Sequence, residues 1–371
     1  MHPTMRGQHL PLEVLLLVAE FLEPNDQLSF LRAVPGIARF LTFRHTAVHD
    51  EDGDTILHLL AYDGEEKLLK LVLANSGIQA DPKNDSDITP LLVAAERGHE
   101  AVVRLLVERD DVDANSMDSD SCEQQSRAGH EAVVKLLIER DDVDVNLKND
   151  DGQTPLHCAA CAGREAMVKL ILERNDVDVN STDNAGRTPL SWVAILGCDV
   201  VMILLLEQDG VQADSKDESG KTPLSWAARG GNEAAVKLLL ERDDVEVDST
   251  DYDDQTPLSH AAKWGQDAVV RLLMERDDVN VNSRDVYSRT PLSWAARNGH
   301  EAVIRLLLER DDVDADSKDD DGRTPLSLLA SWGNEAMVRL LLERGDVDIK
   351  TKDKHEARRC YGQRSLDEQQ C

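Results

Sequence analysis

The fold of this protein is decided by residues 290–310, which read TPLSWAARNGHEAVIRLLLER. Thr290 can cap a helix that begins at Pro291, because the N–H that proline lacks would have no partner at that position. Gly299 can end this short helix in a left-handed conformation. From Glu301 the apolar residues recur at helical spacing, with an acid in the first turn and Arg310 in the last, as the helix dipole favours. The stretch therefore predicts two short helices joined by a glycine turn.

The same pattern recurs along the chain. The triplet Thr-Pro-Leu begins at Thr89, Thr154, Thr188, Thr222, Thr256, Thr290 and Thr324, with a variant at Thr55. From Thr154 onward every interval is 34 residues, and a glycine follows each threonine by nine positions. An acid begins the second helix at Glu66, Glu100, Glu131, Glu165, Asp199, Glu233, Asp267, Glu301 and Glu335. Nine units fit between residues 50 and 352.

A helix, a glycine turn, a second helix and a polar hairpin-like connector, repeated with Thr-Pro-Leu-x-x-Ala, resemble the ankyrin repeat. The resemblance implies an all-α ankyrin-repeat solenoid that binds another macromolecule and performs no catalysis. His58 and His157 keep the histidine usual in the family, and serine replaces it at Ser191, Ser225, Ser259, Ser293 and Ser327. The connector is one residue longer than in the usual 33-residue unit.

The third unit, at about residues 115–145, departs from the pattern. Residues 121–126 read SCEQQS where Thr-Pro-Leu-x-x-Ala is expected, and the interval between glycines shortens from 34 to 31 residues. We expect this degenerate unit to have lost its first helix or to keep a frayed one. Because a repeat array is stabilised by its neighbour interfaces, such a unit is expected to form a seam. An error in the gene prediction is the alternative explanation.

The charge balance argues against nucleic acid as a partner. Asp and Glu total 72 against 41 Lys and Arg, for a formal net charge of -31, which would repel a phosphate backbone. Six irregularly spaced cysteines favour reduced thiols in a cytoplasmic or nuclear protein. The longest apolar run, residues 14–19, is too short to span a membrane. We expect a monomer.

Residues 10–43 precede the repeats and open with LPLEVLLLVAEFLEPNDQLSFL. We expect one helix that ends at Pro24 and a second that is capped by Asp26. The Leu-Pro-x-Glu opening and the Leu22, Pro24, Asp26 turn resemble an F-box, a domain that docks on the Skp1 subunit of cullin-RING ubiquitin ligases. The resemblance implies Skp1 contacts through Leu10, Pro11, Val14, Leu15, Val18, Phe21, Leu22, Leu28 and Leu31. Alternatively, these helices only cap the first repeat. We expect residues 1–9 to be a leader and residues 353–371 to be a polar tail outside the repeats.

Ankyrin stacks usually bind through the hairpin tips and the exposed side of the first helix. In units five to nine these columns hold Arg187, Lys221, Arg229, Tyr252, Lys263, Trp264, Tyr287, Arg289, Arg297, Arg323 and Trp332. Arginines and large aromatic residues supply binding hot spots, so we expect a surface for a protein with acidic and apolar groups. Glu218, Asp253, Asp320 and Asp321 occupy the same columns, which leaves a solvated mixed-charge face as the alternative.

Two further groups of residues are interpreted as structural. Trp192, Trp226 and Trp294 stand four residues after a threonine, where other units have Leu or Val, and we expect them in the core. His157, Cys158 and Cys161 sit within a first helix with no second ligand pair, so we expect no metal site there. We also expect no cofactor. The leading functional hypothesis is a substrate receptor of a ubiquitin ligase, and a stand-alone ankyrin scaffold is the alternative.

Overall fold

The structure, a computed structural model, describes residues 11–115, 131–345 and 347–348. Within these ranges the regular elements are helices, and one isolated bridge joins His49 to Thr55. The chain divides into two units, residues 1–178 and residues 179–371, and each is described by itself below. Repeats are numbered from Thr55 (repeat 1) to Thr324 (repeat 9), and repeat 3 is the degenerate one.

The first unit holds an N-terminal helical segment and repeats 1 to 4. The N-terminal segment consists of α1 (Leu12–Glu20), α2 (Pro24–Ala33), η1 (Pro35–Phe40) and α3 (Phe43–Thr46). The repeat helices of this unit are α4 (Ile56–Tyr62), α5 (Glu66–Leu73), α6 (Pro90–Glu96), α7 (Glu100–Val107), α9 (Glu131–Ile138), α10 (Pro155–Cys161) and α11 (Glu165–Leu172). The degenerate first helix expected around residues 121–126 lies outside the described residues, and α9 is the second helix of repeat 3.

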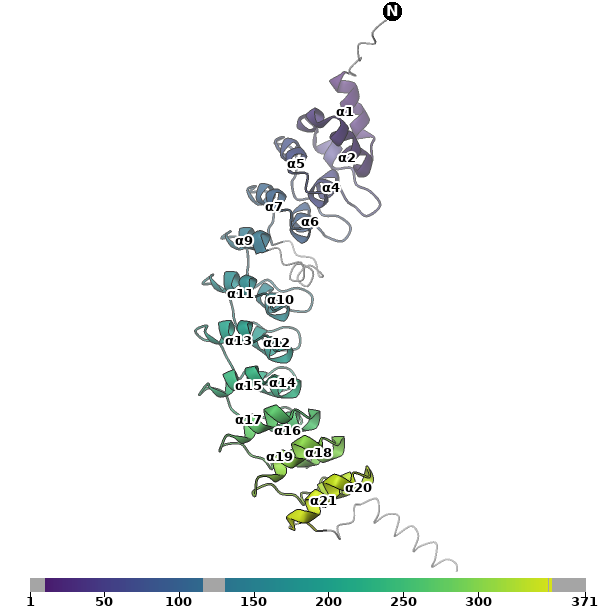
Figure 1. Ribbon diagram of the computed structural model, residues 1–371. Helices are drawn as coiled ribbons and strands as arrows, with labels where there is room; N and C mark the ends of the chain where they lie inside the picture. The colour runs from purple at the N-terminus through teal and green to yellow at the C-terminus, as the bar shows by residue number, and fades with distance from the viewer. Residues whose placement is uncertain (1–10, 116–130, 346, 349–371) are drawn as a thin grey trace, which may run out of the picture. The chain divides into compact units, whose positions relative to one another are not determined.

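The second unit holds repeats 5 to 9, each a pair of helices. Its elements are α12 (Pro189–Leu196), α13 (Asp199–Leu206), α14 (Pro223–Gly230), α15 (Glu233–Leu240), α16 (Pro257–Trp264), α17 (Asp267–Met274), α18 (Pro291–Asn298), α19 (Glu301–Leu308), α20 (Pro325–Ser331) and α21 (Glu335–Arg344). First helices stack on first helices, from α12 to α20, and second helices on second helices, from α13 to α21 (Figure 1). This stacking confirms the all-α repeat fold that the sequence predicts.

Threonine and glycine bound the first helix as expected. The side chain of Thr188 accepts a hydrogen bond from the N–H of Ser191, and Pro189 is the first helical residue. Gly197 ends this helix with a φ of 76°, a left-handed conformation that costs glycine little. Thr222, Thr256 and Thr290 cap their helices in the same way. The repeated short helix therefore follows from local sequence.

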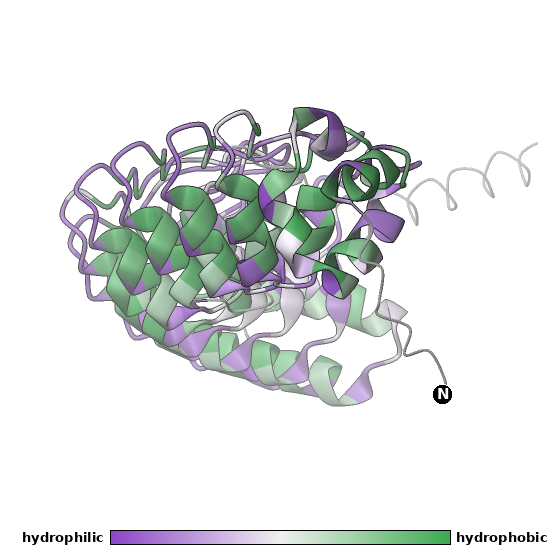
Figure 2. Ribbon diagram, turned by 90° about the horizontal axis from the view of Figure 1, so that it is seen from above, coloured by the Kyte–Doolittle hydropathy of each residue, from purple (hydrophilic) through white to green (hydrophobic). Residues whose placement is uncertain are grey.

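The apolar residues of each repeat face the space between neighbouring helices. Leu292, Ala295, Ala296, Val303 and Ile304 are buried in repeat 8, and the equivalent residues are buried in repeats 5, 6 and 7. Figure 2 shows this distribution, with hydrophobic residues concentrated in the helices and hydrophilic residues in the connectors. Small alanines let successive first helices approach closely, and burial of the apolar residues drives the stacking.

A fork of arginine and aspartate links second helices of successive repeats. The guanidinium group of Arg242 binds both carboxylate oxygens of Asp244, at 2.7 and 2.8 Å, and its Nη1 donates to the carbonyl of Leu206 in the preceding repeat. The neighbouring guanidinium group lowers the pKa of the Asp244 carboxyl. Equivalent forks are built on Arg109, Arg140, Arg174, Arg276 and Arg310. Gln208 occupies this position in repeat 5, and its amide donates to Leu204 in its own helix.

The N-terminal segment differs from its predicted boundaries in two respects. α1 ends at Glu20, and Pro24 is the first residue of α2 rather than the end of α1. Asp26 lies inside the first turn of α2, and Glu23 is the residue at the N-cap. Proline tolerates the first helical position because its missing N–H would have no intrahelical partner there, which explains why Pro24 starts a helix.

Candidate functional site

The predicted binding residues of repeats 5 to 9 lie in the connectors and at the C-terminal ends of the first helices. Four aromatic side chains are exposed to solvent, by 73% for Tyr252, 72% for Trp332, 50% for Tyr287 and 49% for Trp264. Trp264 is the last residue of α16, and Trp332 immediately follows α20. The connector tyrosines and the ends of the first helices thus form one candidate surface, which we call the repeat face.

A buried aspartate organises each connector of the repeat face. Oδ1 of Asp183 accepts hydrogen bonds from the backbone N–H groups of Ala185 and Arg187, both at 2.9 Å, and so holds the turn. Oδ2 of the same carboxylate accepts a hydrogen bond from Nε1 of Trp192 at 2.9 Å. The pattern recurs at 2.9 Å for Asp217 with Trp226 and at 3.0 Å for Asp285 with Trp294. The aspartate therefore ties the connector to the first helix.

Repeat 7 carries the same connection with a histidine in place of the tryptophan. Nε2 of His260 lies 2.9 Å from Oδ2 of Asp251, and both side chains are buried. Burial lowers the pKa of His260 despite the carboxylate beside it. Burial alone would raise the pKa of Asp251, but hydrogen bonds from His260 and the N–H of Gln255 outweigh it and hold the pKa at about 2. The pair is therefore a neutral imidazole that donates to a carboxylate at neutral pH.

Cationic side chains lie over the aromatic rings of the repeat face. The guanidinium carbon of Arg229 is 5.2 Å from the ring centroid of Trp226 and 4.8 Å from that of Trp264. Nζ of Lys263 is 4.3 Å from the ring of Trp294. The other pairs are Arg187 with Trp192, Lys221 with Trp226, and Arg289 with Tyr287 and Trp294. Each of these contacts is stabilised by the attraction between the positive charge and the face of the ring.

The repeat face is less basic than the sequence predicts, because buried aspartates pair with part of its cations. Ion pairs join Arg187 to Asp183 at 3.0 Å, Lys221 to Asp251 at 3.4 Å and Arg323 to Asp319 at 3.1 Å. In the described part of the chain, no ion pair engages the four remaining cations, Arg229, Lys263, Arg289 and Arg297.

One of these four cations, Lys263, lines a groove in repeats 7 and 8, and Arg229 and Arg289 lie over the rings of its tryptophans Trp264 and Trp294. It measures about 400 Å³ and is lined by Lys263, Trp264, Trp294, Asn298 and His300. Burial lowers the pKa of the Lys263 ammonium. A second groove of about 270 Å³ lies in repeats 5 and 6, where Arg187 and Trp226 are joined by the acidic Asp217 and Glu218. Of these two grooves, the first combines aromatic walls with a lysine that makes no ion pair within the described residues.

The three predicted core tryptophans are not equivalent. Trp294 is 7% exposed and belongs to the core, as expected. Trp192 and Trp226 are half-buried, so each also forms part of the surface. The organising aspartates were missed, although the sequence carries their signal. An Asp stands nine residues before each of these tryptophans, at Asp183, Asp217 and Asp285, and before His260 at Asp251.

The family model for ankyrin repeats (3 copies) matches residues 32–118, 124–217, 199–285 and 278–353. The chain belongs to the ankyrin-repeat family. The comparison with curated proteins gives no match. Ankyrin repeats are protein–protein interaction modules, and the fold is typically a non-enzymatic scaffold, so this ankyrin-repeat protein is a module that binds other proteins. The ankyrin match begins at residue 32, and no F-box domain is detected.

The ankyrin-repeat protein begins with a segment that caps the stack. α2 packs on α4 and η1 packs on α5, so these two elements occupy the places of a first and a second repeat helix. Leu28 and Leu31 of α2 are buried, with exposed fractions of 6% and 1%, in the core that the N-terminal segment shares with the first repeat. Their burial argues against the predicted Skp1 contacts at these two residues, which remain predictions.

α1 packs against η1 and α3 and leaves one apolar stripe open to solvent. The stripe consists of Val14, Leu17, Val18 and Phe21, which are 40%, 55%, 42% and 81% exposed and follow the spacing i, i+3, i+4, i+7. Leu15, which we expected on the exposed stripe, packs against the core instead. Leu17 is exposed in its place. Of the other predicted contacts, Pro11 is exposed, Leu22 is half-buried and Leu10 lies outside the described residues.

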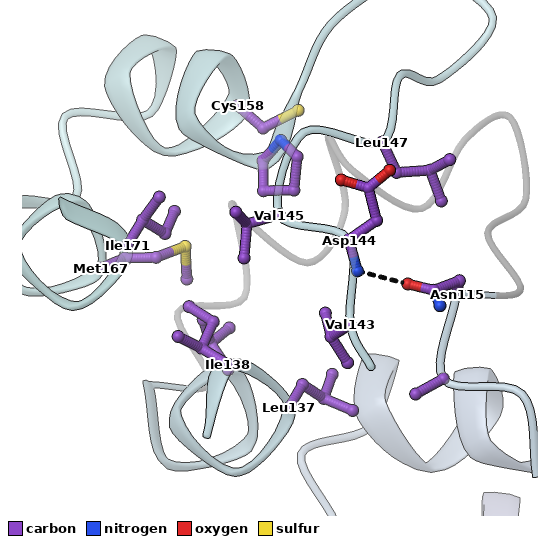
Figure 3. Close-up of a pocket in the computed structure, with 13 residues that line it drawn as sticks. Asn115, Leu137, Ile138, Val143, Asp144, Val145, Leu147, Cys158, Met167 and Ile171 are labelled. Carbon is purple, nitrogen blue, oxygen red and sulfur yellow. Dashed lines mark hydrogen bonds between the residues drawn. The ribbon is translucent and has the colours of Figure 1, made fainter. Parts of the chain in front are cut away.

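The first unit also contains a small apolar cavity of about 90 Å³ (Figure 3). It is lined by side chains of α9, α10 and α11 and of the connectors beside them, among them Ile138, Val145, Cys158, Met167 and Ile171.

His157 and Cys158 serve the fold, since His157 Nδ1 accepts a hydrogen bond from the N–H of Thr154. Across the described ranges no three His, Cys, Asp or Glu side chains are grouped to hold a metal ion. No helix in those ranges is long and apolar enough to cross a bilayer.

Proposed function

We propose that this ankyrin-repeat protein is the substrate-receptor subunit of a Skp1–cullin–F-box ubiquitin ligase. In this proposal α1 binds Skp1 and the repeat face binds the target protein. The observation that carries the proposal is the stripe of Val14, Leu17, Val18 and Phe21, which is apolar and exposed. Contiguous apolar surface of this kind marks a protein interaction site. α2 and η1 already cover the first repeat, so a cap alone does not require the stripe.

The alternative is a stand-alone scaffold whose N-terminal helices only cap the stack. The burial of Leu28 and Leu31 against the first repeat favours a capping role for α2. The two hypotheses differ in α1, which has a partner in one and none in the other.

A pull-down with purified Skp1 distinguishes these hypotheses. Three full-length proteins are compared, namely the wild type, Leu17→Asp/Val18→Asp and Arg39→Asp. Arg39 is exposed on η1, so its substitution by Asp lowers the net charge by the same two units outside the stripe. We expect capture of the wild type and the Arg39 variant and loss of capture in the double variant, with all three folded by circular dichroism. No capture of a folded wild type would favour the scaffold.

We further propose that the repeat face holds a segment of the target with both acidic and apolar side chains. Arg229, Lys263, Arg289 and Arg297 supply positive charge without an acidic partner. Trp264 is half exposed and shares a groove with Lys263, so an apolar side chain can stack there while a carboxylate meets the ammonium group. Tryptophan and arginine dominate binding hot spots, which supports this choice of partner.

Charge reversal tests this second surface once a target is in hand. The variant Arg229→Glu/Lys263→Glu/Arg297→Glu is expected to weaken target binding by at least tenfold. The matched control is Lys237→Glu/Arg271→Glu/Arg305→Glu, at exposed positions on the second helices of the same three repeats. Equal binding by the two triple variants would contradict the proposed face, whatever the result with Skp1.

A further inference from the structure

One connector position, eight residues before the capping threonine, is asparagine in some repeats and aspartate in others. Asparagine occupies it at Asn146, Asn180 and Asn282, and at Asn115 in the register of the degenerate repeat. Aspartate occupies it at Asp81, Asp214, Asp248 and Asp316. Asparagine has an NH2 group where aspartate has a carboxyl oxygen. The position therefore shows the hydrogen bonds of both side chains in the same backbone environment.

Asparagine at this position makes two hydrogen bonds to the next repeat. Nδ2 of Asn282 donates to the carbonyl of Asp312 at 2.7 Å, and its Oδ1 accepts from the N–H of Asp314 at 2.8 Å. Asn180 does the same with Gly210 and Gln212, both at 2.8 Å. Figure 3 shows the accepting half of this pair at Asn115, where the N–H of Asp144 donates at 2.7 Å. Asparagine therefore satisfies one donor and one acceptor of the neighbouring connector.

Aspartate makes only the accepting bond. Asp248 Oδ2 accepts from the N–H of Asn280 at 2.7 Å, and Asp214 accepts from the N–H of Glu246. Oδ1 is buried without a hydrogen-bond partner in Asp81, Asp214, Asp248 and Asp316. Asp248 and Asp278 are 34 residues before Asn282 and Asp312, so by the repeat register the carbonyl of Asp278 faces Asp248 as the carbonyl of Asp312 faces Asn282. When the aspartate is ionised, its Oδ1 and the carbonyl oxygen of the next connector are both acceptors, and neither has a donor. Such an arrangement costs stability when it is buried.

The charges around these aspartates also oppose ionisation. Glu246 and Asp244 face Asp214, and Lys216 is the single cation among its near charges. Asp278 and Glu246 face Asp248 without a compensating cation. Burial is the largest cause that raises the pKa of Asp214, to about 6, and burial also raises the pKa of Asp248. Both carboxyls therefore titrate above the ordinary range of aspartate.

We propose that Asp214 and Asp248 are proton-operated stacking contacts between repeats 6, 7 and 8. A proton on Oδ1 gives each carboxyl an O–H that donates to the carbonyl of Asp244 or Asp278, and this replaces the bond that asparagine makes at every pH. Because the folded protein binds this proton more tightly than the unfolded chain, the contact is fully present below the ordinary pKa of aspartate. Its contribution is lost as the pH rises through about 6 for Asp214.

The test uses the full chain and two charge-matched double variants. Asp214→Asn/Asp248→Asn installs the amide donor permanently. Asp243→Asn/Asp277→Asn removes two negative charges at exposed positions of the same repeats. Hydrogen exchange of the Glu246 and Asn280 amides is measured at pH 7.5 and pH 5. At pH 7.5 we expect several-fold greater protection in the Asp214/Asp248 variant than in the control, and near-equal protection at pH 5.

The reciprocal variant Asn282→Asp extends the test to a repeat that has asparagine at this position. Its Asp314 amide is expected to lose protection at pH 7.5 and to regain it at pH 5. The inference is overturned if the Asp214/Asp248 variant and the control show the same protection at both pH values. It is also overturned if Asn282→Asp responds to pH no more than the wild type.

Discussion

His260 and Asp251 join the first helix of repeat 7 to its connector through a hydrogen bond of 2.9 Å between Nε2 and Oδ2. In repeats 5, 6 and 8 the same carboxylate position binds the indole N–H of a tryptophan. The function of the contact is conserved between repeats, whereas its response to acid is not. Indole does not titrate, but imidazole does, so repeat 7 carries a contact that depends on pH.

Replacement of His260 by Leu is predicted to lower the free energy of unfolding by about 1 to 3 kcal/mol at pH 7.5, because the buried Asp251 loses a donor. The loss should shrink as the pH falls below 6.5. The pKa of His260 is lowered in the folded protein, so the unfolded chain takes up a proton first and the wild type itself loses stability. Denaturant unfolding of both proteins at pH 7.5 and pH 5.5 measures the difference.

The control for this prediction is His49→Leu, which changes an exposed histidine. It should leave the unfolding midpoint within error of the wild type at pH 7.5. A loss for His260→Leu that grows on acidification would contradict the assignment of a neutral, donating imidazole.

The tryptophans of the repeat face should separate into two classes. Trp294 is 7% exposed, so Trp294→Ala is predicted to cost about 3 kcal/mol through lost burial and a residual cavity. Trp332 is 72% exposed, and Trp332→Ala should change stability by no more than about 0.5 kcal/mol. Thermal or urea unfolding monitored by circular dichroism compares the two variants. Similar losses of unfolding free energy would contradict the division of these tryptophans by burial.

The arginine fork of the second helices is predicted to stabilise stacking. Arg242→Gln should cost about 1 kcal/mol, because glutamine cannot reach both Asp244 and the carbonyl of Leu206 as the guanidinium group does. Lys237→Gln removes the same charge from an exposed position of the preceding helix and should be nearly neutral. Urea midpoints give the comparison, and an equal shift in both variants would mean that net charge, not the fork, sets the effect.

The repeat fold could be predicted from sequence because its signals are local. Threonine, proline and glycine fix the ends of each first helix by their own backbone chemistry, and the pattern is repeated often enough to remove ambiguity. The repeat face could be located from the same register. Its charge could not, because the pairing of Arg187 with Asp183 depends on how the connector folds back over the helix.

The orientation of α1 could not be predicted for a different reason. Residues 14–19 are all apolar, so the sequence has no polar side to set the phase of the helix. Only packing against η1 and α3 decides that Leu15 turns inward and Leu17 outward. The burial of Leu28 and Leu31 likewise depends on the first repeat, which supplies the surface that covers them.

In the proposed function, α1 is a docking helix separate from the cap that α2 and η1 form. Hydrogen exchange of the full chain with and without saturating purified Skp1 tests it most directly. We expect slower exchange in peptides that cover Leu12–Glu20 and unchanged exchange in α4, α5 and the repeats of the second unit. Unchanged exchange in α1, with the chain folded and Skp1 in excess, would contradict the claim.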